Sequence, residues 1–286
     1  MHTIYYFSGT GSSLRVARQL ASAMGADLVP MAEAVAQGPA PKRPAVAERQ
    51  CVGLVFPVYA WGLPLVVKRC LRLLPPPDAS AYVWAVMTCG DDVGRTDREL
   101  RRLLCACGWP EVEAVYSVRM PNTYVCLPGF DVDSPEVARR KCEEAERRVA
   151  EVIMPALQQR RRGLTDVVPG AWPWLKSHVL RPLFNWCLTN PAHFAVDKKQ
   201  CNRCGACSRT CPLGAVRPDA EGYPSWERHC THCLACYHVC RRHAVSYGPF
   251  TRGKGQVNVE RENRTWAAAQ TRLFVNWQTR MRLSIN

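Results

Sequence analysis

The stretch YFSGTGSSLRVA, residues 6–17, marks the passage from a strand to a helix near the start of the chain. The apolar run that it ends favours a buried strand, and apolar residues from Leu14 to Met24 recur at helical spacing. Two glycines and four hydroxyl side chains lie between the two patterns. Backbone N–H groups at such a helix start bind phosphate, although a plain strand–helix turn fits the same residues.

Two known phosphate-binding patterns do not fit this loop. No lysine follows Gly11 where a Walker A loop requires one, and Leu14 stands where a dinucleotide fingerprint has its third glycine. A hydroxyl-rich loop without a required cation suits a phosphate monoester.

The strand–loop–helix pattern returns twice, in CVGLVFPVYAWGLP at residues 51–64 and in AYVWAVMTCGDDVG at residues 81–94. A further strand is expected near residues 112–118, and a long charged helix from about residue 135 to 161. Alternating strands and helices predict an α/β fold with a doubly wound parallel sheet. Ligands bind such sheets beyond the carboxyl ends of the strands, so the three loops are expected to gather there.

SGTGSS resembles the phosphate-binding loop of flavodoxins, which Ser8, Thr10, Gly11 and Ser13 match. In related proteins that carry a flavodoxin-like domain fused to another domain, the fifth residue of this loop is commonly Asn. Here the fifth residue is Ser12, whose side chain keeps a hydrogen-bond donor but is shorter than that of Asn. The resemblance implies FMN, held through Ser8, Gly9, Thr10, Gly11, Ser12 and Ser13.

The same resemblance places loops 57–62 and 88–94 beside the flavin ring. The residues that it implies there are Pro57, Tyr59, Ala60, Trp61, Gly62, Thr88, Cys89, Gly90 and Asp91. Tyr59 and Trp61 are the aromatic side chains expected on the ring, with packing at the core edge as the alternative. Candidates for the pocket border, or else for solvated loop positions, are Asp91, Asp92, Arg119, Asn122 and Tyr124.

Eight of the sixteen cysteines are scattered and read as packing residues, and the other eight form two runs. CNRCGACSRTCP at residues 201–212 and CTHCLACYHVC at residues 230–240 share the spacing of cysteines that hold paired 4Fe-4S clusters. The fourth cysteine of each run ligates the other cluster, which gives one set of Cys201, Cys204, Cys207 and Cys240 and a second of Cys230, Cys233, Cys236 and Cys211. Zinc is the alternative, but it leaves the third and fourth cysteines of each run unexplained.

The two runs differ after their last cysteine. Pro212 follows Cys211, whereas Arg241 follows Cys240 and supplies an N–H group and a positive charge.

Together, residues 1–165 and 196–250 resemble fusion proteins of anaerobic bacteria and archaea that join a flavodoxin-like domain to a two-cluster bacterial-type ferredoxin. Residues 166–195 are rich in Pro and Trp, which favours a packed connector. The tail, residues 251–286, is basic and amphipathic; it could lie on a membrane surface or dock a partner, and packing onto its own domain is the alternative.

The formal charge of +14 falls to about +8 after two clusters and an FMN phosphate are counted. No nucleic-acid-binding signature accompanies this charge, so an acidic redox protein such as a ferredoxin is the expected partner. Apolar stretches fall short of a membrane span, and no secretory signal is recognised, so the expected location is the cytoplasm.

These features predict a cytoplasmic electron-transfer flavoprotein that passes electrons between two 4Fe-4S clusters and FMN. A ferredoxin-linked oxidoreductase acting on an unidentified small-molecule acceptor fits, as no NAD(P) fingerprint is present. An electron carrier without a substrate of its own, or a redox sensor, is the alternative.

Overall fold

The computed structural model describes residues 2–36 and 50–257, which form two compact units. The first unit comprises the chain up to Ser8, Ser12–Pro121 and Pro135–Pro182. The second comprises Gly9–Gly11, Asn122–Ser134 and, among the described residues, 183–257. The predicted tail helix falls on residues 258–286, outside the described residues.

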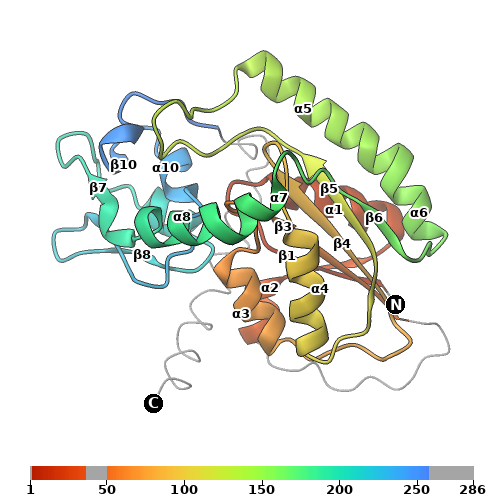
Figure 1. Ribbon diagram of the computed structural model, residues 1–286. Coiled ribbons are helices and arrows are strands. Elements are labelled where there is room, and N and C mark those ends of the chain that lie inside the picture. The colour runs from red at the N-terminus through yellow and green to blue at the C-terminus, as the bar shows by residue number, and fades with distance from the viewer. Residues whose placement is uncertain (1, 37–49, 258–286) are drawn as a thin grey trace. The chain divides into compact units, whose positions relative to one another are not determined.

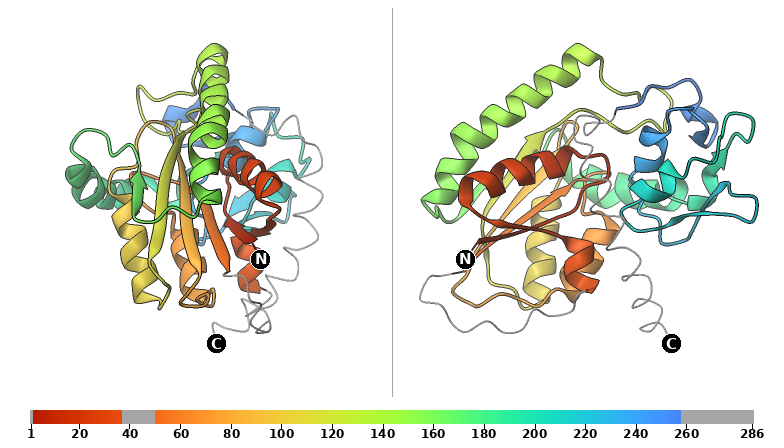
Figure 2. Two further views of the ribbon diagram at one scale, coloured as in Figure 1. Left: turned by 90° about the vertical axis from the view of Figure 1, so that its right-hand side faces the viewer. Right: turned by 180° about the vertical axis from the view of Figure 1, so that it is seen from behind.

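The first unit contains a six-stranded parallel sheet in the order β2-β1-β3-β4-β5-β6 (Figure 1). Its strands are β1 His2–Tyr6, β2 Asp27–Pro30, β3 Cys51–Pro57, β4 Tyr82–Cys89, β5 Val112–Arg119 and β6 Leu164–Asp166. The flanking helices are α1 Ser12–Met24, α2 Met31–Ala36, α3 Leu65–Leu73, α4 Thr96–Ala106 and α5 Pro135–Arg148. Helices α1 and α5 cover one face and α3 and α4 the other (Figure 2). This is a flavodoxin-like α/β fold, as predicted.

The core of this unit lies around the central strands. Every residue of β4 is buried, and β3 is buried from Cys51 to Phe56, which is typical of parallel strands covered on both faces. Trp84 is fully buried against Gly53, where any side chain would collide with the indole ring. The size of Trp84 therefore requires glycine at this position on the neighbouring strand.

Two helices are interrupted by a π-helical turn. The segments are α5 Pro135–Arg148, η1 Val149–Ile153 and α6 Met154–Gln158, and then α7 Pro173–Leu175, η2 Lys176–Leu180 and α8 Arg181–Leu188. Each π turn ends two residues before a proline, Pro155 or Pro182. Proline lacks an N–H group and its ring clashes with the preceding turn, and a wider turn relieves both problems.

The second unit has two small antiparallel ladders. Strand β7 Phe194–Val196 pairs with β10 Val245–Tyr247, and β8 Val216–Pro218 pairs with β9 Pro224–Trp226. Its short helices are η3 Pro191–His193, α9 Ala206–Thr210, α10 Ala235–Val239 and η4 Pro249–Thr251. Residues 122–134 belong to this unit, because the Lys254 ammonium donates to the carbonyl groups of Val125, Leu127 and Phe130 at 2.5–2.8 Å.

The sequence-based expectation of an alternating α/β fold is confirmed, and the expected strands and helices are present with small shifts in their ends. Strands β2 and β6 and helix α2 were not anticipated. Among the described residues, no helix combines the length and hydropathy that crossing a bilayer requires.

Candidate functional site

The loop after β1 has the features of a phosphate site. Gly11 has a φ of 103°, which favours glycine, and α1 begins at Ser12. The Ser13 and Thr88 hydroxyl groups are hydrogen-bonded at 2.7 Å, which ties the helix start to the end of β4. The buried Ser12 hydroxyl has no hydrogen-bond partner among the described residues, which costs about 1–3 kcal/mol. A phosphate oxygen at the helix N-terminus would satisfy it, so the loop fits FMN.

The loop after β3 is a tight turn with unusual backbone angles. Tyr59 and Gly62 exchange two backbone hydrogen bonds of 3.0 and 3.2 Å, and the two residues between them, Ala60 and Trp61, have φ values of 45° and 56°. Glycine or asparagine is usual where a turn demands positive φ at both positions. Holding Ala and Trp there costs about 1–3 kcal/mol each, and such strain gathers at functional sites. The Val58 N–H group also donates to the Thr88 carbonyl group at 2.8 Å, which joins this loop to the end of β4.

The loop after β4 is held from two sides. Lys141 on α5 donates to the Gly90 carbonyl group at 3.2 Å, and the Val93 N–H group donates to the Val168 carbonyl group at 2.9 Å. Burial raises the pKa of Cys89 to about 12, so this thiol is neutral at neutral pH. The loop therefore offers backbone groups and a neutral thiol to a ligand.

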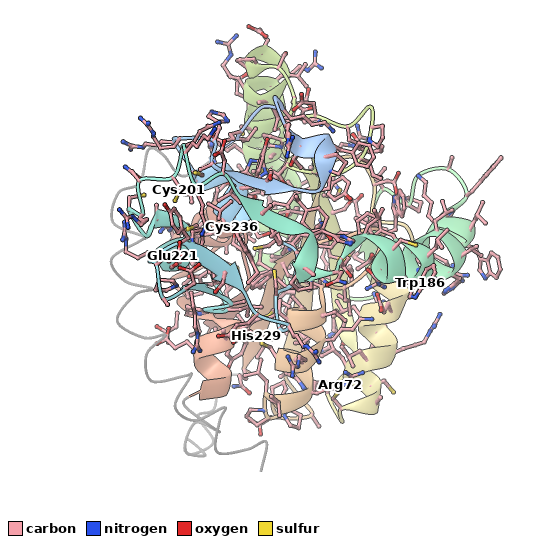
Figure 3. All side chains as sticks on the ribbon, turned by 90° about the vertical axis from the view of Figure 1, so that its left-hand side faces the viewer. Arg72, Trp186, Cys201, Glu221, His229 and Cys236 are labelled. Atoms are coloured by element: carbon pink, nitrogen blue, oxygen red, sulfur yellow. The ribbon has the colours of Figure 1, made fainter. Side chains whose placement is uncertain are left out.

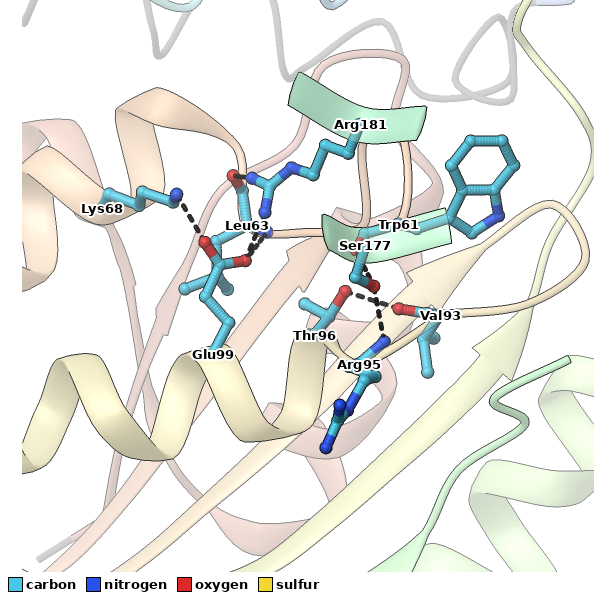
Figure 4. Close-up of polar contacts among 9 residues, drawn as sticks. All are labelled: Trp61, Leu63, Lys68, Val93, Arg95, Thr96, Glu99, Ser177 and Arg181. Carbon is cyan, nitrogen blue, oxygen red and sulfur yellow. Dashed lines mark hydrogen bonds and ion pairs between the residues drawn. The ribbon is translucent and has the colours of Figure 1, made fainter. Parts of the chain in front are cut away.

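Residues of the connector tie these two loops together (Figure 4). The Ser177 hydroxyl donates to the Trp61 carbonyl group at 2.9 Å and accepts from the Arg95 N–H group at 2.8 Å. The Lys176 ammonium pairs with Asp92 at 2.6 Å and lies 5.6 Å from the centre of the Trp61 ring. The strained turn at Trp61 is thus supported by contacts from η2.

A partly buried ion-pair network continues this support toward α3 and α4. Arg181 donates to the Glu99 carboxylate and to the Leu63 carbonyl group, both at 2.6 Å (Figure 4). Glu99 also accepts from the Leu63 N–H group at 2.8 Å and pairs with Lys68 at 2.5 Å. Burial by itself would raise the pKa of Glu99, but Arg181, Lys68 and the Leu63 N–H group outweigh it and lower the pKa. A side chain at Gly62 would collide with the Arg181 guanidinium group, which explains the glycine.

The structure brings together, around Thr88, the loops that the sequence singled out after β1, β3 and β4. Asn122 and Tyr124 belong to the second unit, where the Asn122 N–H group donates to Asp133 and the Tyr124 ring packs on Phe184. Sequence reasoning missed Lys176, Ser177 and Arg181. The Trp- and Pro-rich composition around them indicated packing, but nothing in the sequence identified their partners.

All sixteen cysteines lie in the described part of the chain and none forms a disulfide, so the thiols of both runs are available as ligands. Figure 3 marks Cys201 and Cys236, one from each run.

The two cysteine runs adopt the same backbone, displaced by 29 positions along the sequence. Arg203 and His232 both have a φ of 56°, Gly205 and Leu234 have φ of 69° and 60°, and Gly214 and His243 have φ of 60° and 51°. A five-residue helix follows in each run, and the last cysteine sulfur accepts from a backbone N–H group, of Ala215 at 3.2 Å and of Ala244 at 3.3 Å. The second run thus keeps left-handed positions that no glycine occupies.

The cysteine environments fit iron–sulfur ligation. The Cys230 sulfur accepts from the His232 N–H group at 3.4 Å, and the Cys236 sulfur accepts from the Trp226 indole at 3.4 Å. Burial raises the pKa of Cys230 to about 11 and raises that of Cys233 and Cys236 further, so these thiols need a bound metal centre to ionise. Among the described residues, no three His, Cys, Asp or Glu side chains converge as they would on a single metal ion.

Comparison with known families gives one match. Residues 194–217 match a 4Fe-4S binding domain. The match includes the first cysteine run and ends before the second begins at Cys230. No curated protein matches the chain.

Solved structures with some similarity include the Trp repressor binding protein of Bacillus subtilis, at 8% identity and a TM-score of 0.36, covering 54% of this chain and 97% of that one. A protein of Bacteroides eggerthii assigned as a flavoprotein has 19% identity, a TM-score of 0.27, and coverage of 38% and 84%. Another from Bacteroides uniformis has 18% identity, a TM-score of 0.29, and coverage of 41% and 91%. Because these scores are low, the fold assignment rests on the strand order.

Proposed function

We propose that this chain is an electron-transfer flavoprotein in which two 4Fe-4S clusters exchange single electrons with FMN, and that it acts as a ferredoxin-linked oxidoreductase. The observation that carries the proposal is one chain with a repeated cysteine backbone and a strained loop set at the flavin-binding end of a flavodoxin-like sheet. FMN, when bound, converts between one- and two-electron chemistry.

The fit to FMN rests on the first unit. Ser12 offers an unsatisfied buried hydroxyl group for the phosphate, and the turn at Ala60 and Trp61 is held in a strained conformation beside the end of β4. Lys176 and Ser177 keep the Trp61 turn and the loop at Asp92 in place, so the ring site is formed before the ligand binds.

The second cluster is supported by the repeat. Leu234, His232 and His243 take left-handed backbone angles that cost stability for residues other than glycine. Such angles persist where the surrounding structure enforces them for a function, and wrapping a cubane cluster is the function that the first run implies.

Exposed cations of the second unit favour an acidic redox partner. They are Lys198, Lys199, Arg203, Arg209, Arg241 and Arg242. Their field would steer an acidic ferredoxin, so the second-order rate of flavin reduction should fall steeply between 0.1 and 1 M salt, as the screening length drops from about 10 Å to about 3 Å. Unbridged cysteines that serve as ligands support a cytoplasmic location, and the clusters suit an anaerobic organism.

The test is the cofactor content of protein purified without oxygen, with turnover as a second step. The proposal expects about eight irons and one FMN per chain. About four irons, or a cluster-loaded chain that neither contains nor binds FMN, would overturn it. Anaerobic turnover with reduced ferredoxin and a panel of acceptors then distinguishes a reductase, which consumes an acceptor, from a carrier, which reduces only its own flavin.

A further inference from the structure

Two side chains in the second cysteine run, one buried and one partly buried, have buried polar atoms without hydrogen-bond partners. Within the described chain, neither ring nitrogen of His232 has a hydrogen-bond partner, nor does the buried hydroxyl oxygen of Thr231. The His232 side chain is buried, with 8% of its surface exposed, and lies among the rings of Tyr247, Phe194 and Tyr124. The centre of the Tyr247 ring is 4.4 Å from the centre of the imidazole ring. Although Tyr247 and Tyr124 carry hydroxyl groups, neither forms a hydrogen bond with the His232 ring nitrogens, and the Tyr124 hydroxyl is itself buried without a partner. The imidazole is therefore costly to bury here unless another group accepts its N–H.

The internal repeat provides the comparison. Twenty-nine positions earlier, on a matching backbone, Asn202 and Arg203 are exposed to solvent, and Arg203 donates to the Glu221 carbonyl group at 3.3 Å. The same two positions are therefore exposed in the first run, whereas in the second run Thr231 is partly buried and His232 is buried. The difference lies in the side chains and their surroundings and not in the backbone.

A second histidine of the same run shows that burial alone does not orphan an imidazole. His238 is also buried, but its Nε2 atom lies 2.8 Å from the Thr123 carbonyl oxygen and its Nδ1 atom accepts from the Val257 N–H group at 3.2 Å. Both nitrogens of His238 are thus used by the protein. His232 and Thr231 lie between the proposed ligands Cys230 and Cys233, and their side-chain polar atoms have no partner in the described part of the chain. These atoms are therefore free to bind a group that the protein itself does not supply.

We infer that Thr231 and His232 donate hydrogen bonds to sulfur atoms of the second 4Fe-4S cluster and thereby raise its reduction potential. The inference rests on the second cluster of the proposed function. Donors to cluster sulfur stabilise the reduced form, which carries one more negative charge, and so favour uptake of an electron. The step is the gain of one electron from an external low-potential donor, with no bond made or broken. In a buried aromatic setting, where charge is poorly solvated, these donors would offset the added negative charge of the reduced cluster.

The test is EPR potentiometry on anaerobically purified full-length chain in which iron has been counted. His232→Phe keeps an aromatic ring of similar size and Thr231→Val keeps the shape, so both remove donors with little change in volume. We expect each variant to lower the midpoint potential of one cluster, the double variant to lower it further, and the other cluster to stay unchanged. His232→Gln, which retains an N–H donor, should restore much of the shift. Arg203→Phe changes the matching exposed position of the first run and should not lower the midpoint potential of the second cluster.

A second measurement does not depend on the potential. In reduced protein whose histidines carry ¹⁵N in the imidazole ring only, pulsed EPR should detect a ring nitrogen coupled to a cluster. The coupling should vanish in His232→Phe and persist in His238→Phe. Labelling the ring alone excludes the His232 backbone N–H group, which donates to the Cys230 sulfur. Unchanged potentials in the Thr231 and His232 variants, with about eight irons retained, would overturn the inference and leave the proposed function intact. About four irons in the unmodified chain would overturn both.

Discussion

Arg181→Met tests whether the partly buried ion-pair network holds the loop after β3. The Arg181 side chain is 9% exposed and Glu99 is 27% exposed, and their contact is 2.6 Å. Removing one partner of a buried pair costs about 3–5 kcal/mol, because the remaining charge loses its compensation. Glu99 is partly exposed and retains Lys68 at 2.5 Å, so the cost does not exceed the lower end, about 3 kcal/mol or about a hundredfold in the opening equilibrium.

Native-state hydrogen exchange measures this opening directly, since the Leu63 N–H group donates to Glu99 at 2.8 Å. Peptides that contain Leu63 should lose about a hundredfold of protection in Arg181→Met. Lys198→Met is the matched control, because the Lys198–Glu221 pair is 55% and 65% exposed and solvent screens such pairs strongly. If the Leu63 protection changed no more than this control, the network would not be what holds the loop.

Glu99, the loop after β1 and Arg241 each give a further prediction. Because the pKa of Glu99 is lowered in the folded protein, the stability that its carboxylate contributes is complete above the ordinary pKa of 4.5 and is lost as pH falls through the lower folded value. The hydrogen-exchange protection of Leu63 should therefore decline on acidification below about pH 4.5. Protection that does not change in that range would contradict the role given to Glu99. Thr10→Ala and Ser12→Ala should weaken FMN binding by about five- to tenfold each, as expected for one lost hydrogen bond of about 1 kcal/mol, whereas equal affinity in a fluorescence titration would make the loop a plain turn. Arg241→Pro removes an N–H group and a positive charge beside Cys240 and should lower the potential of the cluster that Cys240 holds; an unchanged pair of potentials by EPR would exclude this role for Arg241.

Much of the fold could be predicted because its signals are local. The buried runs of β3 and β4 and the helical spacing in α1 survive in any context that covers both faces of the sheet. Strands β2 and β6, of four and three residues, are too short and too exposed to show a pattern, and pairing with a longer neighbour defines them. The π turn at Val149–Ile153 depends on Pro155, whose effect on a long helix was not anticipated.

The candidate site divides in the same way. The cysteine spacing and the loop at Ser8–Ser13 are compact motifs whose chemistry is written in adjacent residues. The contact of Lys176 with Asp92 joins residues 84 positions apart, and that of Ser177 with Trp61 joins residues 116 positions apart. No local sequence pattern predicts contacts between residues so far apart in the chain. The orphaned nitrogens of His232 could be recognised only after the packing around the ring was known.

Electron transfer from the clusters to the flavin is the central claim, and stopped-flow spectroscopy tests it most directly. Oxidised protein mixed anaerobically with reduced acidic ferredoxin should bleach in the cluster absorption first and form reduced flavin afterwards. A Cys233→Ala, Cys236→Ala variant that still binds FMN should lose the fast flavin phase, because it removes two of the ligands proposed for the second cluster. Flavin reduction that proceeds at the same rate in this variant, or that precedes any change in the clusters, would contradict the account.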